Sequence, residues 1–481
     1  MRKRYFTLGI LVSINFSYAN IESETFSLEH QLQKAQQKTP NIITQDAFFS
    51  SQKSAVQYEN IVEIHSFEEL TYYLLESINQ KQTEHIQQLL ELYKSQQQAQ
   101  LAMITFAQAN IALNQGERYQ AIKYYEKTLE LAPEFIRAKL DLARLYFSDA
   151  RLTEAKRLFA EIDLPENPTV MEKVQQYRDA LKQREQWQGN ISLSYGYVRN
   201  LNQSAQYQRS YLSDEFGEPV QITQSSPKAI NTMGLKYAFV LNKYQHLSRN
   251  HGIQFRSSIL GEVYRHQPRF QEKQLNTSLS YRYLTRQSDL SLGPFLAWVE
   301  EGGQRLQYDY GFRAEYAFDN LERSYHIFVA EYKQEDYHPA HLKPYSGKQW
   351  RFSATQIFAF KPQTTLFAGI SYTLKHDTEF REDGFYRYGM FAGMEHTFQT
   401  GFSVELSANI NATYYRAFND TLATKRRDLE WTYNANIKAP HWAIGGFEPS
   451  IRYQYQYNLS NVNWLYSYKK SEVYLNWEWR F

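Results

Sequence analysis

The chain ends on the sequence VYLNWEWRF, residues 473–481, and this stretch decides the fold. Successive side chains of an extended strand point to opposite faces. One face is apolar and is formed by Val473, Leu475, Trp477, Trp479 and Phe481, whereas the residues between them are polar or amphipathic. A terminal strand that is apolar outside, polar inside and closed by Phe predicts the last strand of an outer-membrane β-barrel. Soluble sheets show the same alternation, so the rest of the chain has to decide.

The alternation with period two extends back from this stretch to Trp187. Short polar breaks, such as 361–363 and 399–401, predict tight periplasmic turns. Longer polar breaks predict extracellular loops at 200–226, 337–347 and 418–425. The runs between the breaks predict an antiparallel barrel of about fourteen strands over residues 187–481. A β-sandwich is the alternative, but so many strands with polar residues inside and Tyr outside favour the barrel.

The composition agrees with a membrane barrel. Aromatic residues make up 16% of the chain and include 39 Tyr, whereas the mean hydropathy of −0.63 excludes a helical membrane protein. A soluble Tyr-rich binding protein is the alternative. The net charge of +2 gives no support for a nucleic-acid surface. The absence of Cys excludes disulfides, thiolate metal sites and Cys nucleophiles.

The N-terminal residues have the pattern of a targeting segment. Basic residues 2–4 precede an apolar run over 5–16, and small residues flank Tyr18. This pattern predicts a signal peptide, residues 1–19, because the run is too short for a membrane anchor. Residues 20–65 are polar without periodicity and predict a poorly ordered leader.

From Phe67 to about residue 186 the apolar period becomes helical. The sequence GERYQAIKYYEKTLELAP, residues 116–133, resembles the second helix of a tetratricopeptide repeat (TPR). A shift by the 34-residue period of this repeat gives a second unit, in which Ala121 corresponds to Ala155 and Tyr125 to Phe159. The pattern therefore predicts a periplasmic helical domain over residues 66–186 with the architecture of an α-solenoid. A plain helical bundle is the alternative.

The predicted solenoid has a concave face, which is lined by the first helix of each repeat. The residues expected there are Phe106, Asn110, Leu113, Asn114, Arg137, Arg144 and Phe147. Such a face would form a groove for an extended client peptide. The alternative is that these residues are solvated positions on a structural spacer.

Charged and polar side chains are also predicted inside the barrel. They are Arg256, Glu262, Arg351, Arg387, Glu405, Glu430 and Arg452. These residues would form the wall of a conduit, or a network of ion pairs that stiffens a closed barrel. Both interpretations remain open.

No catalytic motif is present. The chain lacks the HExxH, GxSxG, Walker and GxGxxG patterns. His338 and His341 lie near Glu335 and Asp336, but we interpret them as loop residues. The sequence predicts no catalytic residue, no cofactor and no metal.

The order of these parts resembles the surface lipoprotein assembly modulator (Slam) family. The resemblance rests on the helical repeat, its direct junction to WQGNISLSYGYV at residues 187–198, and the terminal WEWRF. It implies an outer-membrane translocation factor whose periplasmic helices capture a client and whose barrel promotes its export. The client would be a surface lipoprotein or a soluble haem- or metal-scavenging protein. The expected partners are this client, outer-membrane lipids and the barrel-assembly machinery, to which Trp477, Trp479 and Phe481 would present the insertion signal.

Three other functions compete with this one. A polysaccharide-export porin also joins TPR helices to a barrel, but usually through a longer helical array. A diffusion porin with an accessory helical domain would conduct ions without a client. An enzyme is the weakest alternative because no catalytic motif is found.

Overall fold

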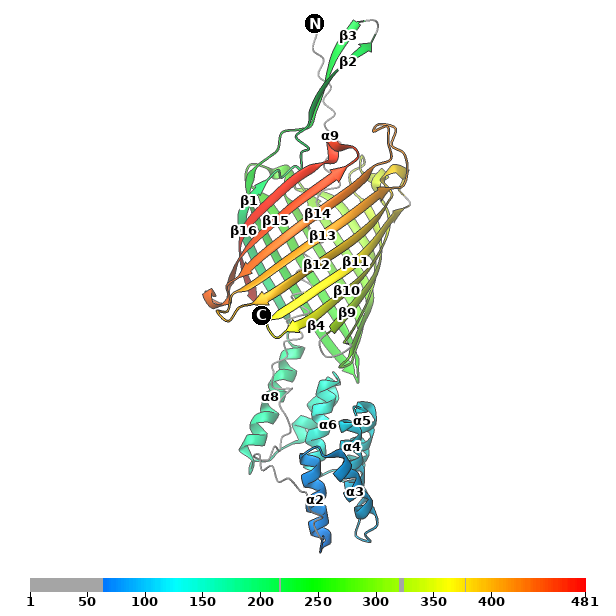
Figure 1. Cartoon of the computed structure of the whole chain (residues 1–481), viewed down its shortest axis with the longest axis vertical. Helices are drawn as coiled ribbons and strands as arrows, with labels where there is room; N and C mark the ends of the chain where they lie inside the picture. The colour runs from blue at the N-terminus through cyan, green and yellow to red at the C-terminus, as the bar shows by residue number, and fades with distance from the viewer. Residues whose placement is uncertain (1–63, 216–217, 320–323, 377) are drawn as a thin grey trace.

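The computed structural model describes residues 64–215, 218–319, 324–376 and 378–481. It has a helical domain at one end, a barrel in the middle and a hairpin at the other end (Figure 1). The predicted signal peptide and the leader up to residue 63 lie outside the described residues.

Seven helices of the described residues precede the barrel and form antiparallel pairs, such as α4 with α5 and α6 with α7. Their bounds are α2 (Phe67–Asn79), α3 (Thr83–Lys94), α4 (Leu101–Asn114), α5 (Arg118–Leu131), α6 (Ile136–Ser148), α7 (Leu152–Glu161) and α8 (Pro168–Glu185). None of the helices in the described ranges is long and apolar enough to cross a bilayer.

The residues that predict the TPR repeat form the core between these helices. Ala121 and Ala155 are completely buried, and so are Tyr125 and Phe159. Small Ala side chains let neighbouring helices approach, and the aromatic rings fill the space beside them. The TPR-like architecture is therefore confirmed.

Fourteen strands form a closed antiparallel barrel, as the sequence predicts. Each barrel strand pairs with the next barrel strand, so β1 pairs with β4, and β1 closes the barrel by also pairing with β16. The strands are β1 (Gln188–Arg199), β4 (Thr232–Ser248), β5 (His251–Tyr264), β6 (Glu272–Leu284), β7 (Ser288–Glu301), β8 (Gln304–Asp319), β9 (Ser324–Tyr337), β10 (Gly347–Lys361), β11 (Thr364–His376), β12 (Phe385–Thr397), β13 (Ser403–Tyr415), β14 (Arg427–Lys438), β15 (Glu448–Ser460) and β16 (Tyr468–Arg480).

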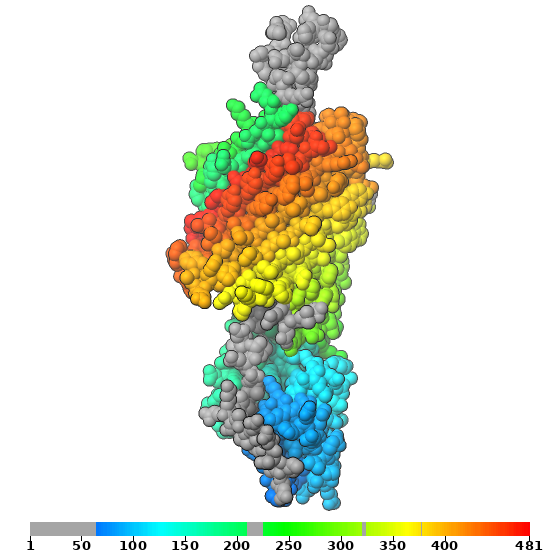
Figure 2. All heavy atoms as spheres, viewed as in Figure 1, coloured from blue at the N-terminus to red at the C-terminus, as the bar shows by residue number. Residues whose placement is uncertain are grey.

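The two faces of the closing strand differ as expected. Leu475 is 43% exposed on the outside, whereas the side chain of its neighbour Asn476 is fully buried. Inside the barrel, Asn476 Oδ1 accepts hydrogen bonds from the hydroxyls of Ser192 and Ser194, each at 2.7 Å. The tilted strands form a continuous outer wall, and the helical domain is a separate lobe below it (Figure 2). Apolar side chains thus face lipid, and the polar side chain of Asn476 is hydrogen-bonded inside the barrel.

The segment after β1 differs from the expected loop. Within 200–226, strands β2 (Gln208–Glu215) and β3 (Glu218–Ser225) pair as a separate two-stranded sheet. This hairpin projects from the end of the barrel opposite the helices (Figure 1). The polar composition suggested a loop because it lacks the alternation of a half-buried strand. Other connections at this end contain the short helices η2 (Pro268–Phe270), η3 (Lys343–Tyr345), η4 (Arg381–Asp383) and α9 (Asn463–Tyr466), whereas η5 (Pro440–Trp442) joins β14 to β15.

Candidate functional site

The helical domain contacts the barrel at the rim formed by the turns β4–β5 and β6–β7. Helix α8 ends at Glu185 and β1 begins at Gln188, so only residues 186 and 187 join the two domains. Lys243 of β4 donates a hydrogen bond to the backbone carbonyl of Glu185. The Trp187 ring packs edge-on against Phe255 of β5, with 5.9 Å between ring centres. The connection is therefore short and held on both sides.

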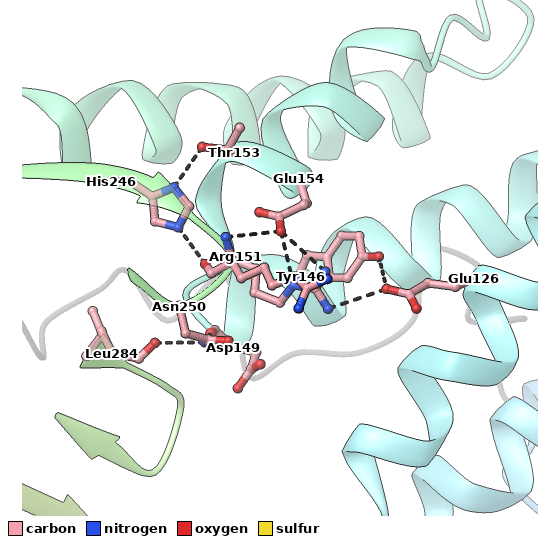
Figure 3. A network of polar contacts seen from close by, with 10 residues as sticks. Glu126, Tyr146, Asp149, Arg151, Thr153, Glu154, His246, Asn250 and Leu284 are labelled. Atoms are coloured by element: carbon pink, nitrogen blue, oxygen red, sulfur yellow. Dashed lines mark hydrogen bonds and ion pairs between the residues drawn. The ribbon is translucent and has the colours of Figure 1, made fainter. Parts of the chain in front are cut away.

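A polar network extends this contact to α7 (Figure 3). The imidazole of His246 lies between Thr153 Oγ1, 2.7 Å from Nδ1, and the backbone carbonyl of Arg249, 2.6 Å from Nε2. Because a carbonyl only accepts, Nε2 donates its proton; in the neutral ring, Nδ1 then accepts from the Thr153 hydroxyl. The backbone N–H of Arg249 donates to Glu154 Oε1 at 3.2 Å. The turn between β4 and β5 is thus bound to the first turn of α7.

Asn250, the next residue in this turn, holds together three segments. Its side-chain amide donates to the carbonyl of Asp149 at 2.6 Å and to the carbonyl of Leu284 at 2.8 Å. The carboxylate of Asp149 in turn accepts from the backbone N–H of Arg286 at 3.4 Å. One amide group therefore connects the α6–α7 link with both barrel turns (Figure 3).

Within the helical domain, Arg151 connects the rim contact of α7 with α5. Its guanidinium lies 3.3 Å from Glu154 and 3.4 Å from Glu126, and 4.1 Å above the ring of Tyr146. The Tyr146 hydroxyl donates to Glu126. Burial, and next the hydrogen bond to Glu126, raises the pKa of Tyr146. These bonds link α5, α6 and α7 at the rim.

An apolar contact lies beside the polar network. Tyr244 of β4 belongs to the same buried cluster as the core of the helices. Arg184 of α8 stacks on Phe147 of α6, 4.2 Å from the ring centre, and burial lowers its pKa to about 10. Helix α8 is therefore fixed between the repeats and the barrel.

Two residues predicted on the concave face do not lie on it. Phe106 is completely buried, with its ring centre 4.8 Å from that of Phe135. Phe147 is also buried and meets Tyr177 edge-on at 5.2 Å. The prediction for these two residues is wrong because the following repeat and α8 cover them with aromatic rings.

The polar residues predicted for this face remain at least partly accessible. Asn110 is half-buried and donates to the carbonyl of Phe106, and Asn114 is exposed. Arg137 bonds Asp141 at 3.2 Å and Asn79 of α2 at 2.9 Å, while Arg144 lies 3.9 Å from the same Asp141.

A further member of the predicted face, Leu113, is half-buried. The accessible part of the concave face is thus mainly polar.

The seven residues predicted for the lumen lie on the inward face of their strands, and several take part in ion pairs. Glu262 bonds Lys236 at 3.0 Å, and the same lysine bonds Glu472 at 2.8 Å. Lys438 lies 3.3 Å from Glu405, and Arg452 lies 3.9 Å from Glu478.

The other four connect neighbouring strands or share a row. Glu430 accepts from Gln456 at 2.8 Å and from Tyr468 at 3.0 Å. Arg351 and Arg387 lie in one lateral row of strand partners with Thr373 between them, and Arg256 faces Asn242 and Ser278. The lumen wall therefore carries both charge signs.

The predicted insertion residues lie at the seam. Phe481 exchanges both backbone hydrogen bonds with Gly189, at 2.9 and 3.1 Å. A Cβ atom at Gly189 would come within 2.3 Å of the carbonyl of Val240 and 2.8 Å of the Phe481 ring, so this close approach requires glycine. Trp479 is exposed and packs against Phe481 at 5.1 Å, whereas Trp477 is half-buried. The last residue thus completes the pairing with β1.

The possible metal ligands of the sequence are not brought together. Glu335 contacts Lys333 at 2.9 Å and Lys375 at 2.7 Å instead of the nearby histidines. In the part of the chain that the structure describes, no three His, Asp or Glu side chains are arranged to hold a metal ion.

Sequence reasoning missed the residues of the domain contact. Thr153 lies 93 residues before His246 in the sequence, and neither His246 nor Asn250 shares a motif with it. The one available signal was Arg249-Asn250, a polar pair in a tight turn, in which Arg249 adopts a positive φ of 51°.

Family models match both parts of the chain. A model of surface lipoprotein assembly modifier proteins matches residues 187–481, and a model of their N-terminal TPR repeats matches residues 60–159. The hemophilin secretion modulator of Acinetobacter baumannii is 28% identical over 84% of each chain. The surface lipoprotein assembly modifier of Pasteurella multocida is 22% identical over 85% of this chain and 82% of its own. Among solved structures, a Pseudomonas aeruginosa FadL homologue has 8% identity and a TM-score of 0.36, over 61% of this chain and 90% of its own.

The family match is consistent with the structure in both halves. The barrel model covers all fourteen barrel strands, and the repeat model covers the helices from α2 through most of α7. A closed barrel with an apolar exterior belongs in the outer membrane. The chain therefore belongs to the surface lipoprotein assembly modifier family.

Proposed function

We propose that this protein is an outer-membrane export factor. The helical domain would receive a client in the periplasm, and the barrel would promote its passage to the cell surface. The names of the relatives support two classes of client, a surface lipoprotein and a secreted protein such as a hemophilin. These partners suit a transport protein rather than an enzyme.

The observation that carries the proposal is the contact at the rim. Asn250, His246 and Lys243 of the barrel bind residues of three different helical segments. A diffusion porin needs no contact between a helical domain and the barrel rim. A helical domain that transfers a client to the barrel needs a fixed orientation relative to the barrel. The polar concave residues Asn110 and Arg144 would then contact the client.

The direction of transport needs a source of free energy. The periplasm holds no ATP, so export would be driven by folding or capture of the client outside the cell. The barrel-assembly machinery would insert the barrel, with Trp477, Trp479 and Phe481 as its signal, among outer-membrane lipids.

A deletion of residues 66–186 tests the proposal. The protein encoded by a neighbouring gene, secreted or carrying a lipobox, is expressed with the full chain or with the deletion variant. Surface display is measured with antibody on intact cells, and barrel insertion by the heat-dependent mobility of the barrel on gels. We expect an inserted barrel and loss of display. Normal display by the deletion variant would overturn the proposal.

Ion conductance separates the porin alternative. The purified full chain is placed in a planar bilayer without client, and its ion conductance is measured. The deletion variant that lacks residues 66–186 is measured in the same way. A steady open-channel current together with client-independent growth on a permeating solute would favour the diffusion porin.

A further inference from the structure

A cluster of arginines lies at the C-terminal end of α6, close to the barrel rim. Arg118 of α5 and Arg144 of α6 lie close enough to repel each other, and Arg286 of the β6–β7 turn repels Arg118 as well. Arg144 also interacts with Tyr177, whose ring meets Phe147 at 5.2 Å, and Arg184 stacks on the same Phe147 at 4.2 Å. Arg118, Arg144 and Arg184, from two helices of the repeats and α8, thus form one cationic cluster beside the β6–β7 turn.

The contacts of these arginines leave much of their charge uncompensated. Arg118 donates to the hydroxyl of Ser148 at 2.6 Å, and Arg184 donates to the backbone carbonyl of Phe147 at 3.4 Å. Arg144 shares Asp141 with Arg137, and the closer bond of this carboxylate, 3.2 against 3.9 Å, goes to Arg137. Two of the three arginines therefore bind neutral groups, and the third has a distant partner.

Burial and repulsion by neighbouring arginines make the positive charge of Arg118 less favourable. Burial is the main cause that lowers the pKa of Arg118 to about 10; repulsion by Arg286 and Arg144 adds to it, and Asp149 opposes it. A guanidinium is always charged in proteins and recognises carboxylates through paired N–H groups. An anion at this surface would reduce the repulsion and accept hydrogen bonds from the guanidinium groups.

We propose that this arginine cluster, formed by Arg118, Arg144 and Arg184, binds an acidic extended segment of the client polypeptide. The inference rests on the proposed export function and specifies its client. An extended peptide fits because polar side chains continue from the cluster along α6: Arg144 shares Asp141 with Arg137, and Arg137 bonds Asn79 of α2. The segment would lie with one end at the barrel rim.

Fluorescence anisotropy of a labelled peptide of ten glutamates tests this inference on the purified full chain. The double variant R118Q R144Q removes two positive charges from the cluster. The matched control K94Q K127Q removes two from exposed helix surfaces, where these lysines pair with Glu91 and Glu130. Circular dichroism and heat-dependent gel mobility check that each variant folds.

We expect the cluster variant to bind the peptide at least about tenfold more weakly, which corresponds to about 1.4 kcal/mol. The control variant should stay within about twofold of the unchanged chain. Equal weakening in both variants, no binding to the unchanged chain, or displacement of the peptide by inorganic phosphate at equal charge concentration would each overturn the inference.

The assay also separates this inference from the export function. A chain that binds the peptide through the cluster but displays no client would overturn the export proposal alone. A cluster variant that loses peptide binding yet displays client normally would overturn the role of the cluster and leave export in place.

Discussion

Asn250 offers the sharpest test of the contact between the domains, through the substitution Asn250→Ala. The change removes the two hydrogen bonds from its side chain to the carbonyls of Asp149 and Leu284. Each such bond contributes about 1 kcal/mol net. Of the two, only the bond to Asp149 joins the helical domain to the barrel, so the loss of about 1 kcal/mol for docking raises the population of the undocked domain roughly fivefold. The backbone bond from Leu284 N to Asn250 O remains, so the barrel turns themselves stay paired.

Hydrogen exchange of the full chain, followed by mass spectrometry, measures this change. We expect faster exchange of the backbone amides in 148–155, which contains the α6–α7 link, and unchanged exchange in the barrel strands. Asn202→Ala is the matched control, because the amide of Asn202 donates to the carbonyl of Lys228 at 2.9 Å at the opposite end of the barrel. Equal exchange of 148–155 in both variants would show that the Asn250 amide does not hold the domain.

Three further predictions concern stability, pH and insertion. Ala150 has φ 60°, where the neighbouring repeat has Gly116 with φ 84°, so Ala150→Gly should stabilise the helical domain by about 1 kcal/mol and Gly116→Ala should destabilise it similarly. Thermal unfolding followed at 222 nm checks both signs, and shifts in the same direction would contradict the reasoning. Burial, and next the nearby Glu382, raises the pKa of Asp383 to about 6, so the η4 loop should lose stability as pH rises from about 4 to 6. Protection of 379–384 against hydrogen exchange should fall over this range, and Asp383→Asn should abolish the change; an unchanged slope in the variant would contradict the assignment. Deletion of Phe481 removes its two bonds to Gly189 and should lower the heat-modifiable fraction in outer membranes, whereas an unchanged fraction would contradict its role in insertion.

The barrel could be predicted from the sequence because the alternation of apolar and polar residues within each strand already determines which face each residue takes. Each strand has to present apolar residues to lipid and polar residues to the interior, so Leu475 and Asn476 already show their faces in the sequence. The start of the barrel could also be predicted, because the apolar period changes from helical to two at Trp187, one residue before β1 begins. The repeat register could be predicted for a similar reason, since Ala121 and Tyr125 recur at a fixed interval.

The candidate site depends on contacts between distant segments, and these could not be predicted. The repeat pattern predicts Phe106 and Phe147 on the concave face, but Phe135 and Tyr177 cover them. Position in a repeat does not reveal which rings a later helix will bury. The bond between Thr153 and His246 likewise exists only because α7 lies against the barrel rim.

The short link between α8 and β1 also has a kinetic consequence. Because only residues 186 and 187 lie between Glu185 and Gln188, the helical domain cannot diffuse away from the rim. A segment held on its surface would meet the barrel entrance at an effective concentration on the order of millimolar, as for partners joined by a short tether. A dilute client would then encounter the entrance by rearrangement within one complex, so its transfer rate would no longer depend on its abundance in the periplasm once it is bound.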